Sequence, residues 1–402
     1  MQNQRQSADI PGVTRAASPE PIAGRPVRVA FVVHVMQVAG AEVLVTETIR
    51  RLETAIEPVV LCLDAIGPLG EELQRAGVPV IALGRKSGLD WATAGAIARQ
   101  VRERDLDVVH AHQYTPFFYG GLGAWWAGRQ TKVIFTEHGR HYPDVVSPKR
   151  RLANRLVLRR LADRVTAVCE FSARALAVND GFEAESVEVI ENGIDVERYD
   201  AVADRRALRE QLNLDATRRY IACIARFHPV KDHHMLIEAF ARVARDLPDV
   251  DLLLVGDGPL RPDLQAQVAA IDLQSRVRFM GVRSDVPEIL KAVDVFALTS
   301  VSEAASITLL EAMATGLPVV VTNVGGNPEI VRAGIDGELV PRGDAAEMSD
   351  ALRKVLTHST LARSMGLNGA QQVRERYRLD RTIERYARIY KDLQAERAQG
   401  ST

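Results

Sequence analysis

The sequence predicts an α/β fold in which two doubly wound domains follow one another along the chain. Short aliphatic and β-branched runs alternate with amphipathic helical segments, stop in a polar, turn-rich stretch at 192–218, and then start again. A length of 402 residues suits two such domains. Near-continuous apolar strands alternating with helices are typical of a parallel sheet that is covered on both faces.

The first series of predicted strands begins with VRVAFVVH at 27–34. The other strands of this series are expected at 58–63, 78–83, 107–112, 132–138, 164–169 and 186–191. Helical segments such as 92–105 lie between most of them. In a parallel sheet, ligands bind beyond the carboxyl ends of the strands, so the residues that follow each strand are the candidates for chemistry.

The second series of predicted strands starts at RYIACIAR, 219–226, and the amphipathic helix 233–247 follows it. Its other strands are expected at 251–256, 276–281, 293–300 and 317–323, and a terminal helix at 381–396. The predicted organisation is a disordered leader (1–26), a first Rossmann-like domain (27–200), a linker (201–215), a second Rossmann-like domain (216–376), and a terminal helix with a tail (377–402), with a cleft between the domains.

Composition limits the class of protein. The net charge of −1 argues against nucleic acid as a partner, and no apolar run reaches the roughly 18 residues of a membrane span. The leader has no apolar signal segment. Cys62, Cys169 and Cys223 lie far apart in apolar runs, which predicts reduced, buried thiols in a cytoplasmic protein.

The stretch EAASITLLE carries two glutamates, Glu303 and Glu311, in a very apolar segment. A carboxylate taken out of water is costly unless it is paired or hydrogen-bonded. Ser306 is a plausible N-cap of the buried helix between them, and the free amides beyond it, at Ile307 and Thr308, suit a phosphate. The functional interpretation is that both glutamates accept hydrogen bonds from ligand hydroxyls. The alternatives are a solvated loop acid for Glu303 and an internal salt bridge for Glu311.

Two further loops of the second domain follow predicted strands. Arg226 and Lys231, in ARFHPVKD, could hold a diphosphate, although a solvated basic loop has the same pattern. Gly256 and Gly258, in GDGPL, allow the backbone to approach a ligand closely, and a plain β–α turn is as good an interpretation.

In the first domain, Gly40 opens a helix directly after the first strand, as a phosphate-approaching loop would. His112 and His138 each stand at a predicted strand end, where a lone histidine is most often structural. The D-x-D patterns at 105–107 and 249–251 precede their strands, on the wrong edge for a parallel-sheet site. They therefore do not predict a metal site.

The segment SPKRRLANRLVLRRLADR is basic and amphipathic, a pattern found in helices that lie on anionic lipid. A solvated helix face is the alternative. The cations of this segment are Lys149, Arg150, Arg151, Arg155, Arg159, Arg160 and Arg164.

Taken together, these motifs resemble the family 4 retaining glycosyltransferases, also called group 1 glycosyl transferases, of the GT-B fold. The matching pieces are GAE after the first strand, EHG, NGID, the Arg and Lys of ARFHPVKD, GDGPL and SEAASITLLEAMATGLPVV. The resemblance covers about residues 27–395. It implies transfer of a sugar from a nucleotide-diphosphate sugar to a glycan, lipid or small-molecule acceptor, with retention at the anomeric carbon and no required metal or cofactor.

The resemblance also implies roles for single residues. Glu311 would hold the donor ribose, Glu303 would meet the sugar hydroxyls, and Arg226 with Lys231 would hold the diphosphate. His138 would lie near the transferred sugar. On the donor side it adds Gly40, Ser306, Ile307, Thr308, Gly256 and Gly258, and His112 is placed on the acceptor side.

The chain departs from the family pattern at three places. Ala39 and Ala225 replace usual glycines, and EAAS, 303–306, replaces the frequent EGFG. These changes are interpreted as tuning donor choice. The expected partners are a nucleotide-sugar donor, a glycan or lipid-linked acceptor and, through the basic segment, an anionic inner membrane face. The alternatives are a nucleotide-sugar epimerase of related fold and a non-catalytic sugar-nucleotide-binding protein.

Overall fold

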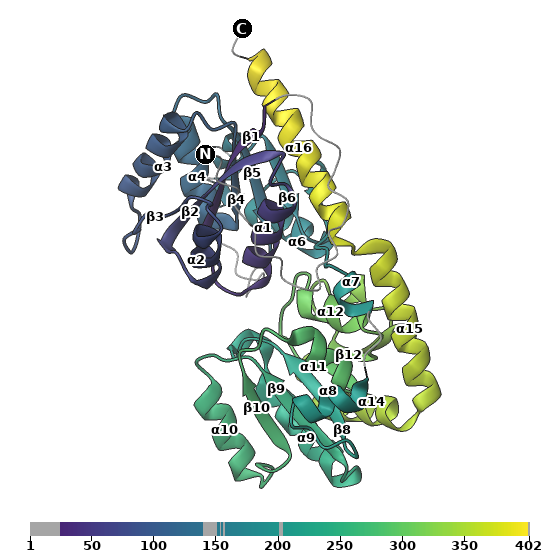
Figure 1. The fold of residues 1–402 in the computed structure, drawn as a ribbon. Coiled ribbons are helices and arrows are strands. Elements are labelled where there is room, and N and C mark those ends of the chain that lie inside the picture. The colour runs from purple at the N-terminus through teal and green to yellow at the C-terminus, as the bar shows by residue number, and fades with distance from the viewer. Residues whose placement is uncertain (1–24, 140–150, 153, 156, 201–203, 401–402) are drawn as a thin grey trace, which may run out of the picture.

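The structure is a computed structural model that describes residues 25–139, 151–152, 154–155, 157–200 and 204–400. It contains two parallel sheets, each flanked by helices, and thus confirms the predicted pair of doubly wound domains (Figure 1). The predicted leader up to residue 24 lies outside the described residues.

The first sheet has the strand order β3-β2-β1-β4-β5-β6-β7, and all its described pairings are parallel. Its strands are β1 Val27–Val35, β2 Ile56–Ala65, β3 Val80–Ala82, β4 Val108–His112, β5 Lys132–Glu137, β6 Arg164–Ala167 and β7 Val187–Val189. The order changes direction at β1, which pairs with both β2 and β4, and such a switch point is where doubly wound sheets bind ligands.

Helices cover both faces of this sheet. They are α1 Gly40–Arg51, α2 Pro68–Arg75, α3 Trp91–Glu103, α4 Tyr114–Trp126, α6 Glu170–Ala175, and the short turns η1 Leu158–Leu161, η2 Leu176–Asp180 and η3 Ala184–Ser186. One apolar core joins the sheet to α1 and α2, and a second joins its other face to α3, α4 and η1.

The second sheet has the order β10-β9-β8-β11-β12-β13 and is also parallel. Its strands are β8 Arg219–Ile224, β9 Val250–Val255, β10 Val277–Gly281, β11 Val295–Leu298, β12 Val319–Thr322 and β13 Gly337–Val340. Its helices are α7 Glu197–Asp200, α8 Arg205–Gln211, η4 Pro229–Lys231, α9 His233–Asp246, α10 Arg261–Ala270, α11 Val286–Ala292, α12 Ile307–Ala314, α13 Asn327–Ile330, α14 Ala345–Thr357 and α15 Ser359–Arg376.

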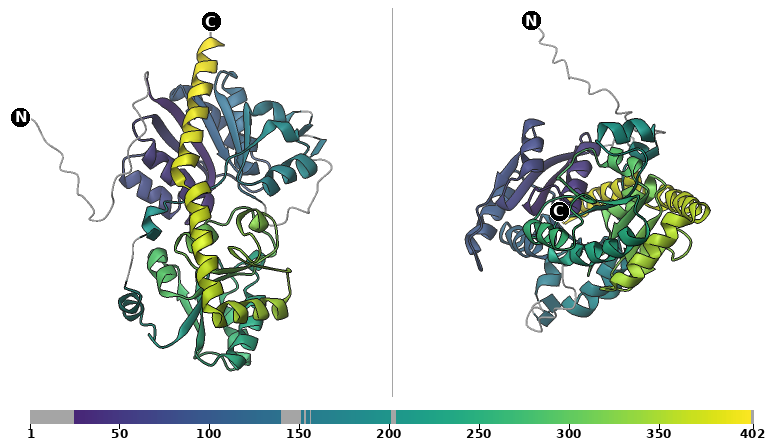
Figure 2. Two further views of the ribbon diagram at one scale, coloured as in Figure 1. Left: turned by 90° about the vertical axis from the view of Figure 1, so that its right-hand side faces the viewer. Right: turned by 90° about the horizontal axis from the view of Figure 1, so that it is seen from below.

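The last helix, α16 (Leu379–Gln399), returns to the first domain, as Figure 2 shows in its left view. It contacts β1, β4 and β5, and its residues Ile383, Tyr386 and Tyr390 are part of the first core. The Arg51 guanidinium donates to Asp380 on α16 and to Asp195 ahead of α7, both at 2.8 Å. The C-terminal helix thereby ties the two domains together.

The three cysteines are buried free thiols, as predicted. In the described part of the chain, no helix is long and apolar enough to cross a membrane.

Candidate active site

Helix α12 begins at the edge of the second sheet that faces the first domain. The Ser306 hydroxyl accepts a 3.4 Å hydrogen bond from the Leu309 amide, so Ser306 is the N-cap that the sequence predicts. The first amides of a helix have no carbonyl partner within it, and here they belong to Ile307 and Thr308. This end of α12 is therefore suited to an anion.

Glu303 lies in the loop between β11 and α12, and its carboxylate is largely buried. Its Oε1 accepts a hydrogen bond from the Ser300 hydroxyl at 2.7 Å and another from the Lys231 ammonium. The structure thus excludes a solvated loop acid for Glu303. It also brings Glu303 and Lys231, 72 positions apart in the chain, into one ion pair.

Glu311 lies one turn into α12 and receives a 2.6 Å hydrogen bond from the Tyr199 hydroxyl. Burial raises the pKa of the Glu311 carboxyl, while the Tyr199 bond acts in the opposite direction. The pKa of Tyr199 is itself raised, first by burial and then by the Glu311 charge. An internal salt bridge, the alternative considered for Glu311, is not formed with any described residue, because its partner is a neutral phenol.

Arg226 follows β8 and is exposed, with no side-chain partner among the described residues. The neighbouring turn holds Gly256, at φ +133°, and Gly258. A Cβ at either position would lie within 2.4 Å of the carbonyl of Ala225 or Phe227. The close approach that these glycines permit is therefore to the loop that carries Arg226, and contact with a ligand remains a prediction.

The first domain meets this region through two glycines. A Cβ on Gly40 would lie 3.2 Å from the Ile307 side chain, and one on Gly139 would lie 2.4 Å from Cβ of Ala304. Gly139 also has φ +98°, a conformation that glycine adopts at no steric cost. The predicted loop after β1 and the EHG segment therefore both abut the start of α12.

His138 follows β5 at this junction, and its Nε2 lies 2.8 Å from Nδ1 of His112. Burial lowers the pKa of His138 to about 4 and holds that of His112 well below its usual value. The sequence placed His112 on the acceptor side, but the structure places it behind His138 and buried. Direct contact between His112 and an acceptor is therefore not supported.

A buried polar chain continues from this pair into the domain. The ring of His110 lies 4.1 Å from that of His112, and its nitrogens lie 2.7 Å from the Tyr390 and Thr136 hydroxyls. Tyr390 belongs to α16. The C-terminal helix is thus linked by hydrogen bonds to the strand that carries His112.

Sequence reasoning missed several contacts at the junction. Tyr199 and Ser300 hold the two glutamates, and Asn192 donates its amide to the Ala305 carbonyl at 3.2 Å. The Glu329 carboxylate accepts from the amides of Glu170 and Phe171 at the start of α6, across the domains. Of these residues, only Asn192 belongs to a motif that pointed to the site from the sequence, the NGID motif.

The D-x-D pairs lie at the amino ends of their strands, as predicted. Asp107 receives hydrogen bonds from Arg25 and Arg397, and Asp251 receives them from Arg218 and Arg276. Within the described residues there is no group of three acidic, histidine or cysteine side chains arranged to hold a metal.

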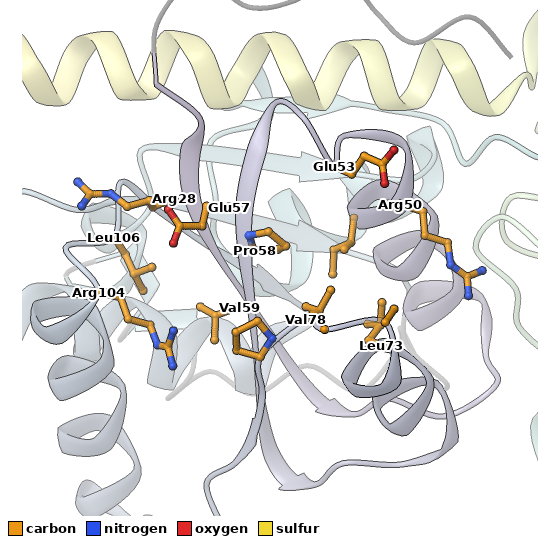
Figure 3. Close-up of a pocket in the computed structure, with 14 residues that line it drawn as sticks. Arg28, Arg50, Glu53, Glu57, Pro58, Val59, Leu73, Val78, Arg104 and Leu106 are labelled. Atoms are coloured by element: carbon orange, nitrogen blue, oxygen red, sulfur yellow. The ribbon is translucent and has the colours of Figure 1, made fainter. Parts of the chain in front are cut away.

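A surface pocket of about 450 Å³ lies elsewhere, at the amino edge of the first sheet (Figure 3). Its apolar floor includes Pro58, Val59 and Val78, with Arg104 and Glu53 among the charged residues around it. The opposite edge of the sheet carries His138. The pocket is therefore separate from the candidate site.

Comparison with known proteins identifies the family. The group 1 glycosyl transferase model matches residues 204–372, and the glycosyltransferase family 4 model matches 38–198. The chain is 30% identical over 310 residues, 76% of its length, to N-acetyl-α-D-glucosaminyl L-malate synthase of Bacillus anthracis, of which it covers 79%. The chain belongs to the family 4 glycosyltransferases. This assignment confirms the resemblance seen in the sequence and favours sugar transfer over the epimerase alternative.

Other relatives agree with this glycosyltransferase assignment. The chain is 27% identical over 315 residues to the UDP-Gal:α-D-GlcNAc-diphosphoundecaprenol α-1,3-galactosyltransferase of Escherichia coli, covering 76% of this chain and 80% of that one. The fold of the present chain matches that of Anabaena HepE, which was solved with UDP and glucose. The TM-score is 0.81 and the identity 23%, over 91% of this chain and all of HepE. The protein is a retaining glycosyltransferase of GT-B architecture, from a family that is generally metal-independent.

Proposed function

We propose that this glycosyltransferase takes its sugar from a uridine diphosphate sugar and transfers it to a hydroxyl of a glycan or lipid-linked acceptor. The main support for the proposal is the arrangement of charged and hydrogen-bonding groups around the start of α12. A helix N-terminus suited to phosphate lies between two held carboxylates and beside the ion-paired Lys231. The E. coli relative is named for a UDP-galactose donor, and HepE was solved with UDP, which supports uridine as the base.

The donor-side roles follow from how each group is held. Glu311 accepts the ribose hydroxyls, because Tyr199 occupies one carboxylate oxygen and leaves the other for the ligand. Glu303 accepts hydroxyls of the sugar while Lys231 and the Ser300 hydroxyl hold its carboxylate in place. Lys231, the exposed Arg226 and the amides of Ile307 and Thr308 hold the diphosphate.

The transfer step that we propose uses no covalent enzyme intermediate. The acceptor oxygen attacks the anomeric carbon from the face that the diphosphate leaves, and the bond between that carbon and the phosphate oxygen breaks. The acceptor proton passes to the departing phosphate oxygen. Negative charge gathers on the diphosphate during this step, so Lys231 and Arg226 stabilise the transition state more than the ground state.

On the acceptor side, His138 lies at the junction with a neutral ring at pH 7, since its pKa is about 4. A neutral imidazole offers one donor and one acceptor nitrogen, and Nε2 is already used by His112. His138 Nδ1 therefore contacts the transferred sugar in our proposal, and the acceptor approaches past the first domain.

A thermal-shift screen tests the donor assignment. UDP-glucose, UDP-galactose and UDP-N-acetylglucosamine are compared with GDP-mannose and with UDP alone. At about 100 times its Kd, the cognate donor should add about 2.7 kcal/mol to the stability. Proton NMR of the product with an added acceptor then reports the anomeric configuration. Stabilisation by GDP-mannose alone would contradict the uridine assignment, and an inverted product would contradict the transfer step.

A further inference from the structure

All three tryptophans of the chain, Trp91, Trp125 and Trp126, lie on the surface of one helical layer. Their exposed fractions are 52%, 44% and 40%, which is unusual for side chains with so much apolar area. The Trp91 ring lies 6.1 Å from that of Trp126 and 6.4 Å from that of Phe118. This group of rings on α3 and α4 is called the tryptophan patch.

Further exposed apolar residues lie on segments that adjoin the tryptophan patch. Helix α4 packs against α3 and against η1, where Gly121 abuts Leu161, and its Tyr114 donates to Asn154 at 2.6 Å. The exposed large apolar residues on α3, α4 and the adjoining described segments are Leu89, Trp91, Trp125, Trp126, Leu152, Val157 and Val178. In Figure 1, α3 and α4 lie on the flank of the first domain opposite α16.

The charges on this layer are mostly positive. Arg129 lies over the Trp125 ring at 5.3 Å, and Arg102 donates to the Trp126 carbonyl at 3.1 Å. From the basic segment, Arg151, Arg155 and Arg160 are exposed. The other four of the seven cations in the basic segment are not counted in this surface charge. Arg159 pairs with Glu183 and Arg164 pairs with Glu396, and Lys149 and Arg150 lie outside the described residues.

We infer that this layer is the surface by which the enzyme docks on an anionic lipid bilayer. Tryptophan rings settle at the boundary between headgroups and acyl chains, where one end of the indole is apolar and the other is wet. Arginines beside the rings attract anionic headgroups, and each arginine raises the partition of the protein onto the membrane about fivefold. A protein partner would explain exposed rings, but the shared positive charge favours an extended anionic surface.

The proposed lipid-linked acceptor suits docking on a bilayer, and in this respect the inference rests on the proposed function. Trp91 begins α3, whereas Trp125 and Trp126 end α4, so the tryptophan patch runs along the two helices and does not mark the sheet edge that carries His138.

Because every tryptophan is in the patch, intrinsic fluorescence reports on docking directly. The whole protein is mixed with vesicles of phosphatidylglycerol and phosphatidylcholine (1:1) or of phosphatidylcholine alone. The emission should move to shorter wavelength only with the anionic vesicles, and lipids brominated on their acyl chains should quench it. Co-sedimentation with an unchanged emission would show that another surface binds and would overturn the inference.

Paired variants separate the patch from a general effect of charge or apolar area. Arg151→Glu with Arg155→Glu should lower partition at least about 25-fold, from about fivefold for each lost cation. Arg245→Glu with Arg363→Glu, two exposed cations of the second domain, is the matched control and should keep most of the binding. Trp91→Ala with Trp126→Ala should weaken co-sedimentation about tenfold or more, and Ile271→Ala with Leu367→Ala should not.

Further measurements keep this inference separate from the proposed function. Binding of UDP by calorimetry without lipid checks that each variant is folded. A protein that binds UDP-sugar but not anionic vesicles would overturn only the docking surface, and one that binds vesicles but no nucleotide would overturn only the donor assignment. Ultracentrifugation that showed a dimer dissociated by the tryptophan variants would assign the patch to a second copy of the chain and overturn membrane docking.

Discussion

Glu42 lies in the first turn of α1, two residues after Gly40, and its carboxyl group is buried. Burial raises its pKa from the ordinary value of 4.5 to about 7. Because the folded-state pKa lies above the unfolded one, the stability associated with this group is fully present below pH 4.5 and is lost as pH rises through 7. Near neutral pH, Glu42 therefore lowers the stability of the first domain as the solution becomes more basic.

The size of this effect follows from the two pKa values. The difference between about 7 and 4.5, at about 1.4 kcal/mol for each pH unit, gives a total cost of about 3 kcal/mol. Glu42→Gln keeps the shape of the side chain and cannot ionise. The variant should be more stable than the natural protein by about 1 kcal/mol at pH 5.5 and by about 3 kcal/mol at pH 8.5.

Urea unfolding followed by tryptophan fluorescence measures this difference, because all three tryptophans lie in the domain that contains Glu42. The same titration on Glu47→Gln is the control, since Glu47 lies on the same helix and pairs with Arg50 near the surface. The comparison of the two variants separates the loss of a buried carboxyl from the loss of one nearer the surface of the same helix. An equal advantage of Glu42→Gln at pH 5.5 and 8.5 would refute the reasoning, because the carboxyl would then titrate alike in both states.

Four other predictions concern the reaction. Glu311→Ala should raise the Kd for UDP. Tyr199→Phe should make that Kd rise more steeply as pH falls, because Glu311 loses a hydrogen bond that lowers its pKa. Calorimetry that showed neither effect would contradict the ribose role of Glu311. Lys231→Ala should lower kcat by about 10²-fold with a smaller effect on donor Kd, by analogy with removing one oxyanion donor; an unchanged kcat rules this out. His112→Ala should lower kcat more than it changes KM, and His112→Asn should restore part of the rate because its amide replaces Nδ1. Excess EDTA should leave the rate within about twofold, and loss restored by Mg²⁺ would place the charge compensation on a metal.

Most of the fold could be predicted because the parallel strands are buried on both faces. Runs such as 219–224 and 250–255 are almost entirely apolar, so their pattern identifies them without any knowledge of neighbours. Strand β13 was missed because its sequence, GELV, is short and contains a glycine and a glutamate. Its place in the sheet comes from pairing with β12 and not from its own propensity.

The region between the domains was harder to interpret from sequence. The predicted linker 201–215 contains α8, whose Arg209 donates to the Ala292 carbonyl and pairs with Asp294. These contacts fasten α8 to the second domain. A polar, turn-rich composition shows where a chain leaves one sheet, but it does not show which domain the next helix will join.

The candidate site shows the same limit for single residues. Residues in the loops that follow strands, such as Lys231 after β8 and Glu303 after β11, could be placed at one edge because parallel strands end together. Tyr199 could not, since it lies in a four-residue helix whose position depends on contacts with α11 and α12. Its hydroxyl nevertheless holds one oxygen of the Glu311 carboxylate.

The histidines extend this argument to the C-terminus of the chain. The His138 ring is held by His112, His112 lies against His110, and His110 is bonded to Tyr390 on α16. A buried polar chain of this kind holds its members in one arrangement only while every link is made. Helix α16 also passes from the second domain to the first, so the helix that joins the two domains also contributes the far end of the network behind His138. The packing of α16 therefore bears on the surroundings of His138, through a contact between His110 and Tyr390 that joins residues 280 positions apart in the sequence.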